Sequence, residues 1–195
     1  MTPLAVDILD ENSLASAALA IGLDGELDLL IVATGLLHSA DGIKPEKSFR
    51  QLDAAAMADI FAVNTIGPAL IAKHLLPLMA TKRRAAAIFL SERVGSIGDN
   101  RLGGWHGYRA SKAALNALTR CFAIEVGRRN PEAIVAALHP GTVDTPLSRP
   151  FQARVVSTSL FSADVSAAHI ISVIDRLKPE DSGGFFGWDG RPIQF

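Results

Sequence analysis

Three short apolar runs, separated by longer helical patterns, constrain the possible fold of this chain most strongly. The runs cover 27–32, 85–91 and 133–138. Continuous apolar runs of this length are typical of strands buried on both faces of a parallel sheet. The helical patterns lie at 53–79, 106–129 and 163–177. Since parallel strands need such crossover connections, the sequence predicts an α/β fold with a doubly wound parallel sheet, in one domain over 1–195.

Weaker signals complete the expected order of elements. A short strand at 4–8 precedes a helix that begins at the cap residues 10–13 and ends near Ile21, and a last strand is expected at 184–188. Asp53 is expected to cap the long helix, and Gly67-Pro68 is expected to bend it. Prolines within the segment 140–161 predict an irregular loop there.

Composition limits the partners of this chain. Its net charge of −1 and its 20% charged residues provide no electrostatic basis for binding nucleic acid or an anionic membrane. The longest apolar stretch, 66–79, is interrupted by Gly67, two prolines, Lys73 and His74, so no membrane-spanning helix is expected. The five histidines show no spacing typical of metal ligands, and no metal site is predicted.

The lone cysteine and the N-terminal residues bear on the cellular compartment of the protein. Cys121 excludes an internal disulfide, and its place in an apolar helical stripe with Ala110, Ala114, Ala117 and Ile124 predicts a buried packing residue. The first seven residues lack a basic segment followed by an apolar core, so no secretory signal is expected. Together these features predict a cytoplasmic protein.

Tyr108 and Lys112 carry the strongest chemical signal. A spacing of four residues places both side chains on one face of a helix. A lysine ammonium there would favour the phenolate and lower the tyrosine pKa from its ordinary value of about 10. Such a tyrosine suits a general acid that protonates a carbonyl oxygen as hydride arrives. Taken alone, however, the spacing is weak evidence and is more often found in a surface helix with a stray tyrosine.

Further polar and small residues occur where the expected elements end. Gly35 follows the strand at 27–32, Asn64 lies in the next helix, Ser91 ends the strand at 85–91, and Pro140-Gly141 follows the strand at 133–138. In a doubly wound sheet these strand ends meet in one crevice, where ligands bind. The sequence therefore predicts that these residues share one site with Tyr108 and Lys112.

With these residues together, the chain resembles the short-chain dehydrogenase/reductase family over its whole length, and in particular the C-factor-like carbonyl reductases. The supporting segments are 93–97, 103–105, 108–115 (YRASKAAL), 139–141, 183–185 and 189–190. The resemblance implies a Rossmann-like fold, NAD or NADP as cofactor, and a small carbonyl compound or secondary alcohol as substrate. It also implies a homodimer or homotetramer formed through the helices at 53–79 and 106–129, although plain core packing explains the apolar stripes of these helices equally well.

The resemblance further implies a role for individual residues. Tyr108 would be the acid/base, Lys112 would lower its pKa and bind the nicotinamide ribose, and Asn64 would hold a water molecule. Asp7 would meet the adenine ring, and Thr34 and Gly35 stand where the family has the end of an Asn-Asn-Ala-Gly motif. The residues expected at the nicotinamide are Pro140, Gly141, Thr142, Val143 and Thr145.

Simpler roles remain open for three of these sites. Asn64 would then satisfy backbone groups at a helix bend, Pro140-Gly141 would form an ordinary turn, and Asp7 would be an exposed strand end. Arginines at 149 and 154 would meet an acidic substrate or, alternatively, remain solvated.

Two departures from the family pattern concern side chains. Glu92 occupies the position of the family's catalytic serine, so Ser91 or Ser96 would have to replace it, and Ser91 is preferred. Strand alternation predicts that Ser91 and Glu92 point to opposite sides. Val32-Ala33 replaces the two asparagines of the Asn-Asn-Ala-Gly motif.

The third departure is the absence of a G-x-x-x-G-x-G turn, whose backbone amides would hold a pyrophosphate. The chain begins near the family's third strand, as if truncated by roughly 50–60 residues, or two βαβ units. Without the intervening strands, the segment 4–8 would either detach and leave 27–32 at a sheet edge, or pair with 27–32 and remove Asp7 from the adenine. An alternative function is therefore an inactive remnant that serves as a binding or oligomerisation module.

Overall fold

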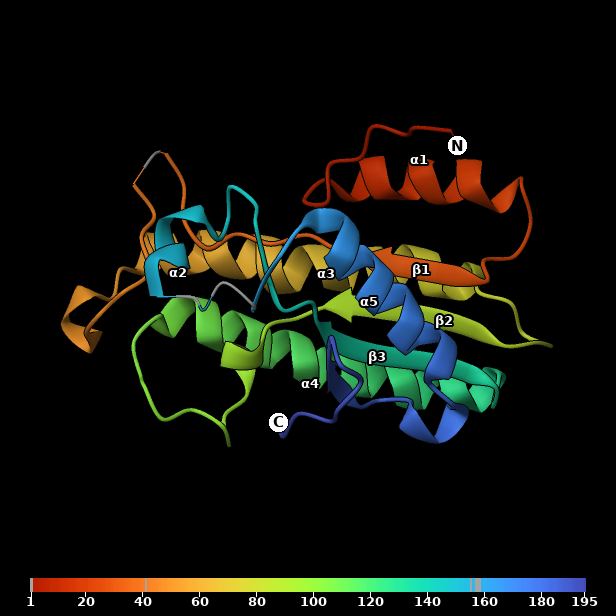
Figure 1. The fold of residues 1–195 in the computed structure, drawn as a ribbon. Helices are drawn as coiled ribbons and strands as arrows, with labels where there is room; N and C mark the ends of the chain where they lie inside the picture. The colour runs from red at the N-terminus through yellow and green to blue at the C-terminus, as the bar shows by residue number, and fades with distance from the viewer. Residues whose placement is uncertain (1, 41, 155, 157–158) are drawn as a thin grey trace.

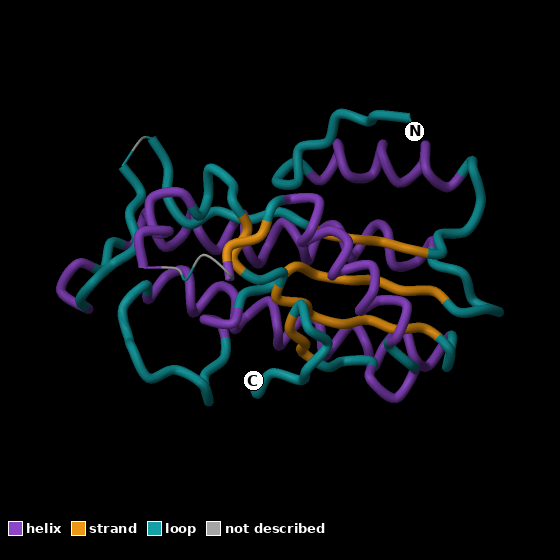
Figure 2. Tube along the Cα trace, viewed as in Figure 1, coloured by secondary structure: helices purple, strands orange, loops and turns teal. Residues whose placement is uncertain are grey.

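A four-stranded parallel sheet forms the centre of the computed structural model, which describes residues 2–40, 42–154, 156 and 159–195. Its strands, in spatial order, are β1 (Leu29–Val32), β2 (Ala85–Leu90), β3 (Ala133–His139) and β6 (Phe185–Gly187). In the register, Ile88 of β2 lies between Ile31 of β1 and Ala136 of β3. Figure 2 shows the long loops gathered at one end of this sheet. The predicted α/β class and parallel sheet are confirmed.

Helices cover both faces of the sheet (Figure 1). On one face, α3 (Gly67–Leu75) and α4 (His106–Arg129) pack on Phe89 and Val135, and α1 (Glu11–Gly22) adds Leu14 to the same cluster. On the other face, α5 (Ala163–Arg176) packs on Ile88 and Ile134. Successive side chains of a strand point to opposite faces, and both faces here are apolar. This explains why the strand sequences are continuously apolar rather than alternating.

The long helical region is continuous but changes its winding. Helix α2 (Ala54–Phe61) begins at Asp53, whose side chain accepts a hydrogen bond from Ala56 N at 2.8 Å, as predicted. A π-helical turn, η2 (Ala62–Ile66), then leads into α3. The irregularity therefore lies directly before Gly67-Pro68, where the sequence indicated a bend. Such wide single turns are frequent at functional sites.

By length and composition alone, the helical region Ala54–Leu78 could cross a membrane, contrary to the expectation from its interrupted sequence. In this structure it packs against α4, and the Thr65 hydroxyl donates a hydrogen bond to Ser111 O at 2.9 Å. The structure therefore uses this region as a helix of the domain core.

The expected strand at 4–8 is wrong. Residues 2–7 are exposed and have no strand pairing, while Ile8 packs against the core cluster beside Gly67. A strand forms only beside a partner, and among the described residues β1 pairs with β2 alone. Of the two arrangements expected for the segment 4–8, the structure therefore shows the detached one. Strand β1 is left at the edge of the sheet, where Leu29 is 43% and Ile31 37% exposed.

The expected loop at 140–161 contains more structure than its prolines indicated. Strand β4 (Thr142–Val143) pairs in parallel with β5 (Leu160–Phe161), and the 3₁₀ helix η5 (Arg149–Arg154) lies between them. Strands of two residues are too short to leave a periodic signal in a sequence. Further 3₁₀ helices within the described ranges are η1 (Phe49–Gln51), η3 (Leu76–Leu78), η4 (Arg93–Gly95) and η7 (Pro179–Asp181).

Helix α4 buries a different face from the one predicted. Cys121 is exposed, as are Ala110, Ala117 and Ile124. The buried face instead carries several polar side chains: the Thr119 hydroxyl donates to Leu115 O at 2.8 Å, whereas the Asn116 amide has no hydrogen-bond partner among the described residues. Because small apolar residues occur all around this helix, hydrophobicity alone did not identify the buried face.

Candidate active site

A cavity of about 750 Å³ opens at the carboxyl ends of β1, β2 and β3. This is where an open parallel sheet binds ligands. Among the residues that line it are Thr34, Gly35, Ser91, Tyr108, Lys112, Pro140, Gly141, Thr142, Val143 and Thr145. The structure thus brings together every predicted site residue except Asp7, which lies elsewhere, and Asn64, which lies directly behind the cavity wall.

Tyr108 and Lys112 lie one turn apart near the start of α4, and both are buried. The Lys112 ammonium is 5.9 Å from the centre of the Tyr108 ring and donates a hydrogen bond to Leu90 O at 3.0 Å. Burial lowers the pKa of Lys112 to about 8. Burial, together with the Glu92 carboxylate, raises the pKa of Tyr108 well above its ordinary range. The predicted lowering of the Tyr108 pKa is therefore wrong for this structure, because burial and the Glu92 carboxylate both favour the neutral phenol.

Asn64 is fully buried in the π-helical turn and fixes the loop that follows β1. Its side-chain oxygen accepts from Leu36 N at 2.7 Å, while its nitrogen donates to Leu36 O at 2.8 Å and to Ser111 Oγ at 3.0 Å. A Cβ at Gly35 would lie 3.8 Å from Lys112 Nζ and 3.9 Å from Asn64 Oδ1. Asn64 thus satisfies backbone groups of the loop after β1 rather than those at a helix bend, and in doing so it holds Gly35 beside Lys112.

Ser91 is the better placed of the two candidate serines. Its hydroxyl oxygen is buried at the cavity wall and has no hydrogen-bond partner among the described residues. Ser96 Oγ instead accepts from Asp99 N at 3.0 Å, and Ser96 does not line the cavity. The predicted divergence of Ser91 and Glu92 is wrong, since both line this cavity: β2 ends at Leu90, and strand alternation stops there.

Asp7 does not reach the site. It is exposed, its carboxylate accepts from Leu9 N at 2.9 Å, and its own N–H donates to Ser13 Oγ at 3.0 Å. These contacts close the turn that precedes α1. The prediction for Asp7 is wrong because it required a strand at 4–8, and that strand is absent from the sheet.

A hydrophobic wall of the cavity was missed by the sequence reasoning. Trp105 packs edge-on against Phe151 and Tyr108, with ring centres 4.9 and 6.2 Å apart, and Leu37 and Leu147 line the same cavity. Trp105 has φ +52°, an uncommon conformation for a residue other than glycine. The glycines at 103 and 104, which have positive φ as well, were the available sequence signal for this turn.

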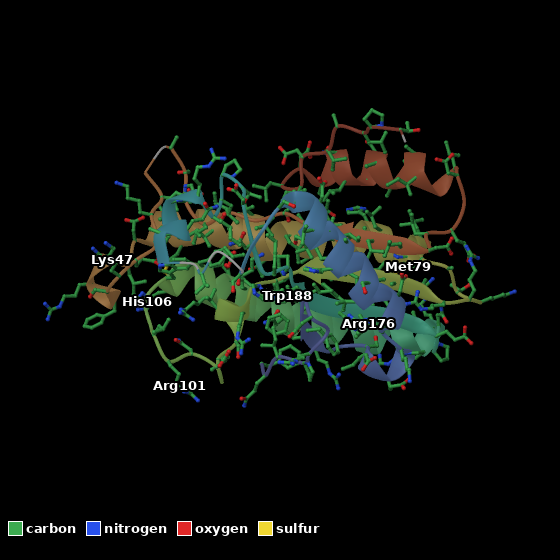
Figure 3. The ribbon with its side chains drawn as sticks, viewed as in Figure 1. Lys47, Met79, Arg101, His106, Arg176 and Trp188 are labelled. Atoms are coloured by element: carbon green, nitrogen blue, oxygen red, sulfur yellow. The ribbon has the colours of Figure 1, made fainter. Side chains whose placement is uncertain are left out.

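Gly141 is required by the turn after β3. It has φ +78°, and a Cβ there would lie 2.6 Å from Phe161 Cε2 and 3.0 Å from Trp188 Cδ1. Trp188, labelled near the centre of Figure 3, packs edge-on against Phe161 with ring centres 4.7 Å apart. The Pro140-Gly141 segment is therefore a close-packed wall of the cavity rather than an ordinary turn.

A parallel sheet with a tyrosine–lysine pair at the carboxyl ends of its strands places this chain among the Rossmann-like α/β proteins. The short chain dehydrogenase family model matches residues 1–155. Since that match covers more than half of its length, the chain belongs to the short-chain dehydrogenase/reductase family.

Individual relatives agree with this assignment. The C-signal protein of Myxococcus xanthus is 34% identical over 143 residues, which cover 73% of this chain and 80% of that protein. The 1-hydroxy-2-glutathionyl-2-methyl-3-butene dehydrogenase of Rhodococcus sp. (strain AD45) is 29% identical over 205 residues, 98% of this chain and 88% of that protein.

Solved structures show the same fold. The NADPH-bound carbonyl reductase from chicken fatty liver superposes with a TM-score of 0.82 at 28% identity, covering 98% of this chain and 76% of that one. The carbonyl reductase Sniffer of D. melanogaster gives 0.83 at 26% identity, covering 98% and 77%. The predicted family and its carbonyl reductase-like subgroup are confirmed.

Proposed function

We propose that this chain is an NAD(P)-dependent oxidoreductase that interconverts a carbonyl compound and a secondary alcohol. The observation that carries the proposal is the grouping of Tyr108, Lys112 and the unpartnered Ser91 hydroxyl around one cavity at the strand ends. Relatives whose names describe carbonyl reductases, one of them NADPH-bound, support it.

The residues present fit the nicotinamide end of a dinucleotide. Thr34 Oγ1 is buried at the cavity wall without a partner among the described residues, and Gly35 allows close approach to Lys112. Thr34, Gly35, Lys112 and the 140–145 segment would hold the nicotinamide and its ribose. When bound, the dinucleotide supplies or accepts the hydride. Since the sequence has no glycine-rich phosphate turn, we expect weaker cofactor binding than such a turn would give.

The side chains then divide the proton chemistry between them. In the reducing direction, the Tyr108 hydroxyl gives its proton to the carbonyl oxygen, which becomes the alcohol oxygen. The Ser91 hydroxyl donates a hydrogen bond to that same oxygen, and the Lys112 ammonium stabilises the phenolate left on Tyr108. Because burial lowers the Lys112 pKa to about 8, this ammonium is present at neutral pH and is lost as the pH rises above that value.

The outward face of α4 supports self-association. Ala110, Ala117, Cys121 and Ile124 are exposed there, and on the neighbouring helical region Ile66 is exposed as well. We propose that a second copy of the chain covers this apolar surface.

A second candidate is an inactive binding or oligomerisation module. It is favoured by Glu92 at the position of the family's catalytic serine and by the absence of the glycine-rich turn. Tyr108→Phe separates the candidates, because an oxidoreductase loses turnover and keeps its fold, whereas a binding module is little affected.

Titration of the purified chain with NADH and NADPH tests the proposal. Saturable changes in nicotinamide fluorescence, followed by carbonyl-dependent NAD(P)H oxidation that Tyr108→Phe abolishes, are the expected results. A folded chain that binds neither cofactor at millimolar concentration would contradict the proposed activity. The inactive binding or oligomerisation module would then be the remaining candidate function.

A further inference from the structure

The two charged side chains of the cavity differ in how accessible they are to a substrate. Among the described residues that line it, Glu92 and Lys112 carry the formal charges, and all others are neutral. Lys112 is 3% exposed, and its ammonium donates to Leu90 O. The Glu92 side chain is 26% exposed and therefore more accessible to a ligand. Of the two charged side chains in the cavity, the carboxylate is therefore the one that a ligand meets at the surface.

Local contacts hold the Glu92 carboxylate in place at the cavity. Glu92 Oε1 accepts a hydrogen bond from Arg93 N at 3.1 Å. The Arg93 guanidinium is directed instead to Asp99, with Nε 2.6 Å from Oδ2. His139 Nδ1 lies 2.9 Å from Glu92 Oε1, but this contact lacks hydrogen-bond geometry. Within the described part of the chain, the Glu92 carboxylate therefore faces the cavity with the His139 ring as its neighbour and without an arginine or lysine in contact.

The remaining walls suit an uncharged, flat substrate. The edge-on pair of Trp105 and Phe151 stands beside Tyr108, and Leu37 and Val94 extend the apolar surface. Arg149 is exposed and does not line the cavity, and the side chain of Arg154 lies outside the described residues. The walls thus offer no described arginine that would pair with a substrate carboxylate.

We propose that Glu92 is a specificity residue, and that this site takes uncharged aryl or other planar apolar carbonyl compounds while rejecting those with a carboxylate beside the carbonyl. The proposal rests on the proposed carbonyl chemistry for its substrate class. A carboxylate placed next to Tyr108 would meet the like charge of Glu92 in a partly desolvated cavity, where screening by water is weak. This role differs from that of the serine in the family pattern, because a carboxylate selects by charge and cannot donate a hydrogen bond.

Equilibrium binding tests the proposal without any turnover. Methyl phenylglyoxylate and phenylglyoxylate share one aryl carbonyl and differ in a single charge. Their binding to the full chain is measured by quenching of tryptophan emission, since Trp105 lines the cavity, and is repeated in Trp188→Phe to isolate that signal. The wild type should bind the ester at least tenfold more tightly than the acid, and added salt should narrow this gap.

Glu92→Gln is the decisive variant, because it keeps the shape and the acceptor for Arg93 N. It should tighten acid binding about tenfold, equivalent to about 1.4 kcal/mol, and change ester binding less than twofold. Glu132→Gln is the matched control: the same substitution at an exposed position outside the cavity should alter neither affinity.

Three outcomes would overturn the proposal: equal binding of ester and acid by the wild type, an unchanged acid affinity in Glu92→Gln, or no binding of either compound by the folded chain. Failure of the proposed oxidoreductase activity would look different. In that case neither NADH nor NADPH would support reduction of the ester, while the preference for ester over acid and its loss in Glu92→Gln would persist.

Discussion

Asn64 and Leu36 exchange two hydrogen bonds, with Leu36 N donating to Asn64 Oδ1 at 2.7 Å and Asn64 Nδ2 donating to Leu36 O at 2.8 Å. A side-chain amide thereby replaces a backbone partner for the loop that leaves β1. The same amide donates to Ser111 Oγ, one residue from Lys112. One buried residue therefore ties the end of β1 to the helix that carries the proposed acid/base pair.

Asn64→Ala should lower the free energy of unfolding by about 1–3 kcal/mol, because it leaves two partly buried backbone groups of Leu36 without their partner. Urea denaturation measures this loss. Asn100→Ala, a substitution of the same kind at an exposed position, is the control and should cost less than about 0.5 kcal/mol. Equal stability of the two variants would contradict a structural role for the Asn64 amide.

The sequence was sufficient to predict the strands and helices whose apolar residues follow a regular pattern. The strands at the centre of the sheet and the helix at 106–129 were predicted within about two residues, because burial on both faces leaves a continuous apolar run. The segment 4–8 has the same local composition. A strand also needs a neighbouring strand to pair with, however, and the local apolar pattern does not show whether one is available. The pairing of β4 with β5 was missed because two residues carry no period.

Site residues could be predicted where they lie at strand ends. The prediction failed where the role of a residue depends on its side-chain environment. Ser91, Gly35 and Gly141 follow from topology, which brings strand ends together. The pKa direction of Tyr108 does not, because it depends on burial and on the carboxylate of Glu92. Trp105 was overlooked for the same reason: its role depends on the ring of Phe151, which is distant in sequence and belongs to no motif.

Tyr108 is the single tyrosine of the chain, so the near-ultraviolet absorbance of tyrosinate reports its ionisation alone. Burial and the Glu92 carboxylate raise its pKa, so in the wild type tyrosinate should appear only as the protein unfolds at alkaline pH. Glu92→Gln removes one of the two causes and should move the ionisation to lower pH. Tyr108→Phe provides the blank. An identical titration curve in Glu92→Gln would show that the carboxylate does not act on Tyr108.

Lys112 predicts a pH dependence of stability. Its pKa is about 8 in the folded chain against an ordinary value of 10.5, so between these values the unfolded chain binds more protons and stability rises with pH. Lys112→Met removes this contribution. Its destabilising effect should therefore be smaller at pH 7 than at pH 10, by roughly 2 kcal/mol at about 1.4 kcal/mol per pH unit.

Urea denaturation of the wild type and Lys112→Met from pH 7 to pH 10 measures that difference. Lys82→Met is the control, since Lys82 is exposed and its replacement should give no such slope. A destabilisation by Lys112→Met that stays constant across this range would mean that the buried lysine does not change its protonation there.

Glu46 substitutes for a missing cap at the start of α4. Trp105, the N-cap residue, makes no side-chain capping bond, and the buried Glu46 carboxylate instead accepts from Gly107 N at 3.2 and 3.3 Å. A carboxylate at a helix N-terminus also interacts favourably with the helix dipole. Glu46→Ala should therefore lower the free energy of unfolding by about 1–2 kcal/mol, and Glu46→Gln, which keeps an acceptor but no charge, should lower it less. Urea denaturation gives both values, with Glu132→Gln as the exposed control.

Since Gly107 directly precedes Tyr108, loss of this cap should also weaken tyrosine-dependent turnover. An unchanged stability in Glu46→Ala would instead assign the cap of α4 to other groups.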